Sequence, residues 1–214
     1  MHSDDLETDD TPADGQGGSI GRKRPKPGER RVQILQTLAA MLEQPGAERV
    51  TTAALAARLQ VSEAALYRHF ASKAQMFEGL IEFIESSVFG LVQQITQREN
   101  NPSQCAARLV TMLLQFGEKN PGMVRVMVGD ALVFEHERLQ QRMNLFFDKF
   151  DAALRQALRE AAPTSDTPTT DTNVLAGVLT AFAVGRLQRF ARSGFRRVPT
   201  EQLDAALVLL LADA

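Results

Sequence analysis

Apolar residues recur at helical spacing along almost the whole chain after residue 28. The first such stripe consists of Ile34, Leu35, Leu38 and Met41, and the helix breaker Pro45 follows it. No alternating apolar–polar stretch of useful length appears, so nothing in the pattern indicates strands. We therefore predict an all-α fold of about nine helices, one ending before residue 45 and the others over 52–59, 62–70, 72–95, 102–118, 121–128, 131–161, 171–193 and 200–212.

Two segments lack this periodicity. Residues 1–28 are rich in Asp, Gly and Pro and poor in large apolar residues, which is typical of a disordered tail. Residues 162–170 have the composition of an internal loop. No apolar run approaches the roughly 20 residues that a membrane helix needs, and the acidic start is unlike a signal peptide. Together with the single cysteine, Cys105, these features favour a soluble protein of the reducing cytoplasm without membrane insertion.

Charge is distributed unevenly, although the whole chain has a formal net charge of only −2. Residues 1–21 contain six acids and no Lys or Arg. Residues 22–75 contain ten Lys and Arg against four acids, a balance of +6, and residues 76–214 have a balance of −2. A basic module on a near-neutral body is typical of nucleic-acid-binding proteins, although a charge run alone is more often a solvated face.

The stretch 52–70 has the pattern of two short helices joined by a tight turn. Ser62 is placed to cap the second helix through its hydroxyl group, and that helix would bury Leu66 and Phe70. This is the pattern of a helix-turn-helix, whose second helix enters the major groove of DNA; the alternative is an ordinary helical hairpin. Three side chains on the outward face of the second helix could contact bases and phosphates: Ala64, Tyr67 and Arg68.

This module resembles the DNA-binding domain of the TetR family of regulators over about forty residues. The matching stretches are the supporting helix 34–42, Thr51–Ala53, Leu59–Ser62, Ala65–Phe70 and Ser72–Lys73. Gln60 departs from the family, which usually has Gly there; a left-handed Gln costs on the order of 1 kcal/mol, so we expect a strained or reshaped turn. The resemblance implies a tail over 1–28, a helix-turn-helix domain over 29–75 and a dimerising, partner-binding helical body over 76–214.

The resemblance also implies the residues that contact DNA. The phosphate contacts would come from Thr51, Thr52, Tyr67, His69 and Lys73. The residues at or near the bases would be Ser62, Ala64 and Arg68. A basic run just before the module is either an arm that follows the minor groove or the phosphate backbone, or a solvated linker; it consists of Arg22, Lys23, Arg24 and Lys26.

Within the family, the resemblance extends along nearly the whole chain after the tail to the nucleoid occlusion branch. The stretches that carry it include 80–85, 116–122, 131–135, 138–142 and 189–193. Members of this branch bind short palindromes scattered over the chromosome and, when bound, antagonise the tubulin-like division protein FtsZ. The resemblance therefore implies a cytoplasmic, nucleoid-associated protein with two partners, double-stranded DNA and FtsZ.

Phe83 is the residue of the body that best fits a partner-binding surface. It lies roughly 120° from the inward stripe of its helix, so it could anchor a partner or pack on a neighbouring helix. The resemblance favours the partner and adds Lys119 and Asn120 to the same groove. The family pattern favours Arg at position 119; Lys keeps the positive charge but not the bidentate geometry.

The last two helices are expected to pair two copies of the chain. The helix over 171–193 is rich in small residues, and the next one ends in the apolar run 205–211, which is too apolar for an exposed tail. Family members pair these helices into a four-helix interface. The alternative is a merely intramolecular core, and the number of dimers on each DNA site stays open.

No pattern of an enzyme or a cofactor site is evident. His2, His69 and His136 lie on unrelated segments, and there is no metal-ligand spacing, Gly-rich phosphate loop or Cys/His nucleophile pattern. The main alternative function is a ligand-responsive repressor. In that case several residues would line a pocket and not fill a core: Met112, Phe116, Met123, Met127, Phe134 and Phe182. A purely architectural DNA protein, with little sequence preference and a steep salt dependence, is a third possibility.

Overall fold

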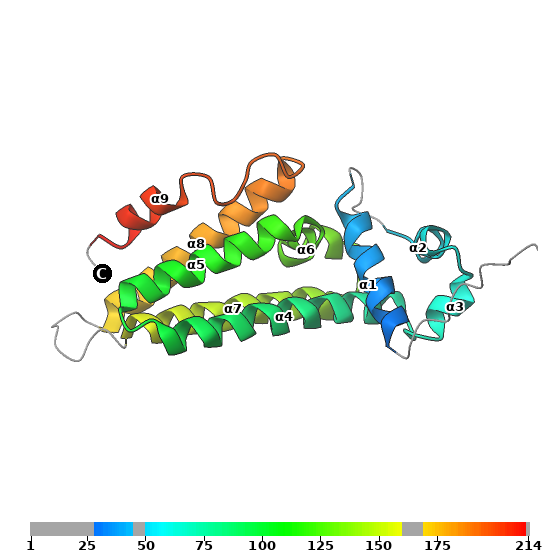
Figure 1. Ribbon diagram of the computed structural model, residues 1–214, viewed down its shortest axis with the longest axis horizontal. Coiled ribbons are helices and arrows are strands. Elements are labelled where there is room, and N and C mark those ends of the chain that lie inside the picture. The colour runs from blue at the N-terminus through cyan, green and yellow to red at the C-terminus, as the bar shows by residue number, and fades with distance from the viewer. Residues whose placement is uncertain (1–27, 45–49, 160–168, 213–214) are drawn as a thin grey trace, which may run out of the picture.

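The computed structural model describes residues 28–44, 50–159 and 169–212, and all regular structure in these ranges is helical, which confirms the predicted all-α fold. A small module stands at one end of an elongated body (Figure 1). The module consists of α1 (Glu29–Leu42), α2 (Thr52–Leu59) and α3 (Glu63–Tyr67). The body consists of α4 (Lys73–Arg98), α5 (Pro102–Lys119), α6 (Pro121–Met127), the 3₁₀ helix η2 (Asp130–Leu132), α7 (Glu137–Arg159), α8 (Thr169–Arg192) and α9 (Leu203–Leu210).

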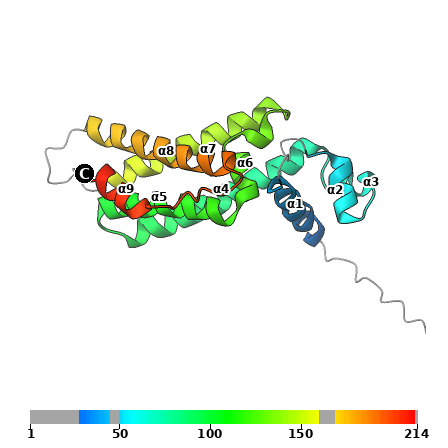
Figure 2. The ribbon, with the colours of Figure 1, turned by 90° about the horizontal axis from the view of Figure 1, so that it is seen from above.

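Four long helices form the body. α4 packs on α5 and α7, and α8 packs on α5 and α7, so the bundle closes around one core (Figures 1 and 2). Phe77 and Ile84 of α4 and Phe146 and Phe150 of α7 are fully buried in it. Each such side chain stabilises the fold by about 1.5–3 kcal/mol relative to an exposed one, so this core holds the long helices in a fixed arrangement.

α4 and α6 connect the module to the body. α4 packs on α1 and continues into the bundle, and α6 also packs on α1 (Figure 1). Gly122 in α6 lies so close to α1 that a Cβ atom there would come within 2.0 Å of the carbonyl oxygen of Ala39. Glycine therefore permits a contact between α1 and α6 that any larger residue would push apart.

The helix predicted over 131–161 is wrong at its start. The chain forms η2, leaves helical geometry over residues 133–136, and begins α7 at Glu137. His136 supports this break, because its Nδ1 accepts a hydrogen bond from the backbone N–H of Arg138 at 3.3 Å in the first turn of α7. Buried apolar residues continue at helical spacing on both sides of the break, which is why periodicity alone did not reveal it.

Smaller differences concern helix ends. α3 is shorter than the predicted 62–70, α4 continues to Arg98, and α9 begins at Leu203 after Gln202, which has a positive φ of 51°. Helix ends are where periodicity is least informative, because the last turns need not carry a buried face. Residues 1–27 and 160–168, which include all but the last residue of the predicted tail and most of the predicted loop, lie outside the described residues.

α8 is an exception to the expectation that no segment is long and apolar enough for a membrane helix. Its segment Thr172–Arg192 is long and apolar enough to cross a membrane by length and composition, with a mean hydropathy of 1.3 in its most apolar window. These criteria are weak evidence for one helix, because core helices of soluble proteins meet them too. One face of α8 packs on α5 and α7, and the other carries the exposed apolar residues described below.

Candidate nucleic-acid interface

The turn between α2 and α3 is closed by a left-handed residue. Gln60 has φ 55° and ψ 46°, as its position in the motif led us to expect, and its backbone N–H donates back to carbonyl groups of α2. The N–H of Val61 donates to the carbonyl of Ala56 at 3.0 Å. Leu55, Ala56 and Leu66 are buried between the two helices. The turn therefore fixes how α3 is presented, at a cost on the order of 1 kcal/mol for the left-handed Gln.

Hydroxyl groups cap three helices of this region. The side-chain oxygens of Thr51, Ser62 and Ser72 accept hydrogen bonds from the N–H groups of Ala54, Ala65 and Gln75, at 3.1, 3.3 and 3.2 Å. The predicted cap at Ser62 is thus confirmed. A hydroxyl that accepts such a bond can still donate its proton to a phosphate oxygen. Thr52 differs, because its hydroxyl already donates to Glu63 at 2.6 Å and so ties α2 to α3.

The outward face of α3 has the direction that helical spacing predicts. Leu66 and the following Phe70 are buried, whereas Ala64, Tyr67 and Arg68 are exposed. A methyl group, a phenol and a guanidinium group are therefore exposed on one face of α3 and its C-terminal end. Such a set can offer apolar contact to a thymine methyl group and hydrogen bonds to bases and phosphates.

Arg31 belongs to this region although sequence reasoning gave it no role beyond its charge. Its guanidinium group donates to the backbone carbonyl of His69 and lies 4.1 Å from the centroid of the Phe70 ring. The backbone of the half-buried His69 is therefore held against α1. The two ends of this contact are 38 residues apart, so no local pattern could have revealed it.

Lys73 and Glu135 form an ion pair between the start of α4 and the segment before α7. The Lys73 and Glu135 side chains are 26% and 10% exposed, so the pair is partly shielded from water. Thus the Lys73 amino group, which the family resemblance assigns to a DNA phosphate, is engaged with a carboxylate of the body.

Two further ion pairs join α4 and α7 in the same order along the helices. Arg138 contacts Glu78 at 2.8 Å, and Arg142 contacts Glu85 at 2.6 and 3.2 Å. The hydrogen bonds that Arg142 donates to Glu85 raise the pKa of the Arg142 guanidinium group above its already high value, against the opposing effect of burial. The first part of α7 is therefore attached to α4 through charged groups on successive turns.

The three candidate partner residues differ in their surroundings. Phe83 on α4 is 48% exposed, so it does not pack into the core. Lys119 is exposed at the end of α5. Asn120 is half-buried and its side-chain amide donates to the carbonyl of Phe116 at 2.7 Å, which caps α5. Phe83 and Lys119 are therefore the members of this set with accessible side chains.

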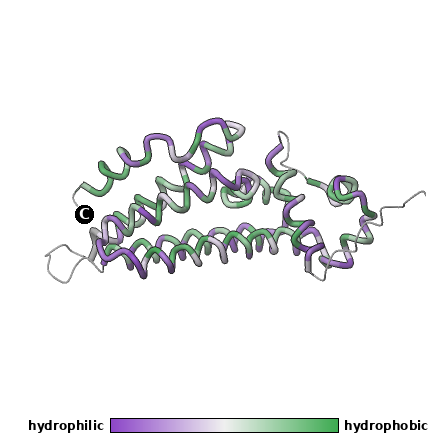
Figure 3. Tube along the Cα trace, viewed as in Figure 1, coloured by the Kyte–Doolittle hydropathy of each residue, from purple (hydrophilic) through white to green (hydrophobic). Residues whose placement is uncertain are grey.

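α8 and α9 expose an apolar face. Val174 and Val178 of α8 and Val208 and Leu209 of α9 are exposed, and Figure 3 shows the hydrophobic character of the α9 end of the chain. A Cβ atom at Gly177 or Gly185 would meet nothing within 4 Å, so these positions of α8 also face open space. Exposed apolar residues gathered on neighbouring helices are typical of a protein–protein interface.

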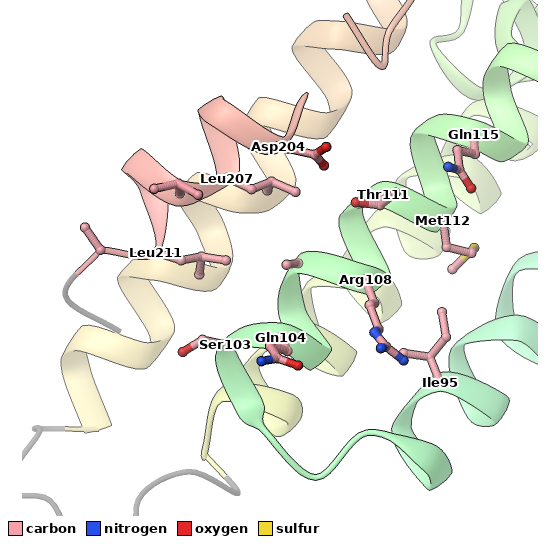
Figure 4. Close-up of a pocket in the computed structure, with 13 residues that line it drawn as sticks. Ile95, Ser103, Gln104, Arg108, Thr111, Met112, Gln115, Asp204, Leu207 and Leu211 are labelled. Atoms are coloured by element: carbon pink, nitrogen blue, oxygen red, sulfur yellow. The ribbon is translucent and has the colours of Figure 1, made fainter. Parts of the chain in front are cut away.

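A cavity of about 730 Å³ lies between α5 and α9, near the end of α4 (Figure 4). Leu207 and Leu211 project from α9 toward α5 across it, and Met112 borders it from α5. Of the six residues considered as pocket lining, Met112 is the one that lines this cavity. The others fill the core, lie at its edge or are exposed: Phe116 and Met127 are buried, Met123 and Phe182 are half-buried, and Phe134 is exposed.

Some predicted features are not placed by the structure. Arg22, Lys23, Arg24 and Lys26 of the basic run lie outside the described residues. Within the described ranges, no group of three or more His, Cys, Asp or Glu side chains is arranged to hold a metal ion, and Cys105 is buried.

Comparison with known proteins gives two family matches on this chain. Residues 34–80 match the bacterial regulatory proteins of the tetR family, and residues 105–213 match the tetracyclin repressor-like C-terminal domain of SlmA-like type. The nucleoid occlusion factor SlmA of Salmonella paratyphi B is 50% identical over 185 residues, which cover 86% of this chain and 93% of that protein.

Solved structures share the fold at low sequence identity. The fatty acid degradation regulator FadR from Bacillus halodurans has a TM-score of 0.71 at 15% identity and covers 89% of this chain and 98% of its own. AibR, solved in complex with isovaleryl coenzyme A and operator DNA, has a TM-score of 0.68 at 18% identity and covers 85% of this chain and 98% of its own. At these identities the likeness is evidence for the fold alone.

Proposed function

Because this chain belongs to the TetR family, in its branch of SlmA-like nucleoid occlusion factors, we propose that it binds chromosomal palindromes and, once bound, inhibits FtsZ assembly. Division over the nucleoid would thereby be blocked, in the cytoplasm where both partners are found. The family consists of DNA-binding regulators and not of enzymes, in agreement with the expectation from the sequence. The observation that carries the DNA half of the proposal is the exposed face of α3, and the FtsZ half rests on the exposed Phe83.

DNA binding would place α3 in the major groove. Arg68 would read a base edge, with Ala64 and Ser62 at or near the bases. Phosphate contacts would come from the residues around the helix: Thr51, Thr52, Tyr67, His69 and Lys73. The basic run 22–26 would follow the backbone or minor groove as an arm. For Thr52, a phosphate contact requires the hydroxyl to leave Glu63 or to rotate between them.

A symmetric dimer would present two copies of α3 to the two halves of a palindrome. The exposed faces of α8 and α9 support this arrangement, because Val174, Val178, Val208 and Leu209 would leave water on pairing. The module lies at the opposite end of the molecule from α9 (Figure 1), so pairing through these faces leaves α3 accessible.

FtsZ would dock on the α4–α5 side of the body. Phe83 is an exposed aromatic residue suited to anchor a partner, and Lys119 adds a positive charge at the end of the neighbouring helix. Asn120 would contribute mainly by holding the end of α5, since its amide is bonded to Phe116.

The decisive experiment measures sedimentation of FtsZ polymers with this protein, in the presence and absence of a duplex selected from a random pool. We expect the wild-type protein to reduce polymer only with the selected duplex. The double variant Phe83→Ala/Lys119→Glu should lose this effect while binding the duplex with unchanged affinity. Leu145→Ala, which removes another exposed apolar side chain from α7, serves as the matched control and should behave as wild type.

Two results would contradict the proposal. FtsZ polymer that is unaffected by the DNA-bound wild-type protein would remove the partner half. Loss of duplex binding or of dimerisation in the double variant would show that Phe83 and Lys119 serve the fold and not a partner.

The cavity between α5 and α9 favours a second candidate function, a ligand-responsive repressor. A volume of about 730 Å³ is within the range of small-molecule sites, and its lining is largely apolar. In this function a metabolite would release the protein from DNA. Screening apolar metabolites for release of the selected duplex distinguishes the two functions, because the nucleoid occlusion factor should retain DNA in their presence.

A further inference from the structure

Lys73 has two anionic partners available to it. In the free protein its amino group is bonded to Glu135, which is 10% exposed. In the proposed function the same amino group contacts a DNA phosphate. Two anions that share one ammonium group at hydrogen-bond distance repel each other, so both contacts cannot be held at full strength.

The segment that carries Glu135 is the break between η2 and α7. Val133 and Phe134 are 70% and 67% exposed, so apolar burial contributes little to holding this segment in place. Glu135 instead turns inward to Lys73, 62 residues away in the sequence. The ion pair is thus one side-chain attachment between this segment and the start of α4.

We propose that Glu135 competes with a DNA phosphate for Lys73, so that DNA binding takes Lys73 from Glu135 and releases residues 133–136 from α4. This inference rests on the phosphate contact of Lys73 in the proposed function. Before a phosphate can use Lys73, the pair with Glu135 has to be given up, and the protein binds DNA more weakly than it would without that carboxylate.

Two further ion pairs connect the beginning of α7, next to the released segment, with α4, the helix that carries Phe83. The next two ion pairs along α7, Arg138 with Glu78 and Arg142 with Glu85, follow the pair at Glu135 in order along the same two helices. Glu85 and Phe83 are both on α4 but only two residues apart, so they point to different sides of that helix. A change at the start of α7 would therefore act on Phe83 only by moving α4 as a whole.

The first test compares Glu135→Gln with Glu78→Gln by fluorescence anisotropy of the selected duplex. Both variants remove one negative charge from an ion pair between α4 and the α7 region, so the change in net charge is the same. We expect Glu135→Gln to bind about two- to five-fold more tightly than Glu78→Gln, the range expected for a partly exposed ion pair. Equal affinities, or weaker binding by Glu135→Gln, would overturn the proposal.

Lys73→Gln separates this inference from the proposed function. If Lys73→Gln binds the duplex as tightly as wild type, Lys73 makes no phosphate contact, and the inference fails while only this one contact of the proposed function is lost. If Lys73→Gln weakens binding but Glu135→Gln behaves as Glu78→Gln, the phosphate contact stands and the competition is wrong. In the Lys73→Gln background, we expect Glu135→Gln to give no gain over Glu78→Gln.

Hydrogen exchange of the wild-type protein gives a test that needs no substitution. The backbone N–H groups of Glu135 and Leu139 donate to Leu132 and His136 at 3.0 and 2.9 Å, so their exchange reports on the segment. We expect faster exchange over residues 133–139 when the selected duplex is bound. Unchanged or slower exchange on DNA would show that the segment stays attached, which contradicts release.

Discussion

The DNA-binding module and the C-terminal face of the body differ in how far a single chain buries their apolar side chains. In the module, Leu55, Leu66 and Phe70 are each 1% exposed, and hydroxyl groups cap its helices. On the body, Val208 and Leu209 of α9 are 69% and 81% exposed. The module buries its apolar residues within a single chain, whereas the face formed by α8 and α9 leaves large apolar side chains exposed.

This difference separates two requirements of palindrome recognition. The module needs a rigid presentation of one reading helix, which short-range contacts supply. In the proposed dimer the face of α8 and α9 would set the distance between two such helices, which no contact within one chain can supply. Substitutions in the two regions should therefore affect DNA binding in distinct ways.

The largest effect on DNA binding is expected from a charged residue introduced into the exposed apolar face of α8 and α9. Leu209→Glu should convert the dimer to a monomer, because an ionised carboxylate would have to be buried without a partner. Affinity for the palindrome should then fall about 100-fold or more, since two linked binding events become separate ones. Sedimentation equilibrium gives the oligomeric state, and anisotropy gives the affinity.

Leu145→Glu is the matched control for this substitution. Leu145 on α7 is also exposed, at 56%, and should tolerate the charge without a change in oligomeric state. A Leu209→Glu protein that remains a dimer would place the interface away from α9 and would remove the contrast between the two regions.

A smaller effect is expected in the module from Arg68→Ala. If Arg68 reads a base, the free energy of binding to the selected duplex should weaken by about 1–3 kcal/mol, with a smaller loss on random DNA. The dimer should be unaffected, because Arg68 lies on the exposed face of α3.

Arg98→Ala removes an equal charge at the far end of α4 and controls for the general electrostatic attraction. Titrations of both variants with selected and random duplexes supply the comparison. An equal loss on the two duplexes for Arg68→Ala would mean that this residue contacts only phosphate.

The contrast between local and distant contacts also explains what the sequence could predict. The cap at Ser62 and the outward direction of Tyr67 and Arg68 follow from residues within a few positions of each other, whereas the left-handed Gln60 was expected from the resemblance to the family motif. The same spacing rules predicted the long helices, because each buries one continuous apolar face.

Contacts between distant residues could not be predicted in this way. The Arg31–His69 and Lys73–Glu135 contacts join residues 38 and 62 positions apart, and side-chain charge alone does not select among the available partners. The break at 133–136 was missed for a related reason, since its polar attachment to α4 leaves the helical spacing of the flanking apolar residues intact.

The smallest effect is expected at the turn inside the module. Gln60 has a left-handed backbone that costs an L-residue on the order of 1 kcal/mol and costs Gly almost nothing, so Gln60→Gly should raise the free energy of unfolding by up to about 1 kcal/mol. Gln94→Gly, at an exposed position inside α4, should lower the free energy of unfolding by roughly 1 kcal/mol, because Gly is a poor helix former.

Urea denaturation of both variants measures whether the free energy of unfolding rises in one and falls in the other. Opposite changes in the free energy of unfolding would establish that the backbone strain lies in the turn at Gln60. They would also exclude that Gly is stabilising at any exposed position. If Gln60→Gly destabilises the protein as Gln94→Gly does, the Gln60 side chain stabilises the turn by more than its backbone strain costs. The module would then depend on a specific contact of Gln60 and not only on backbone geometry for the presentation of α3.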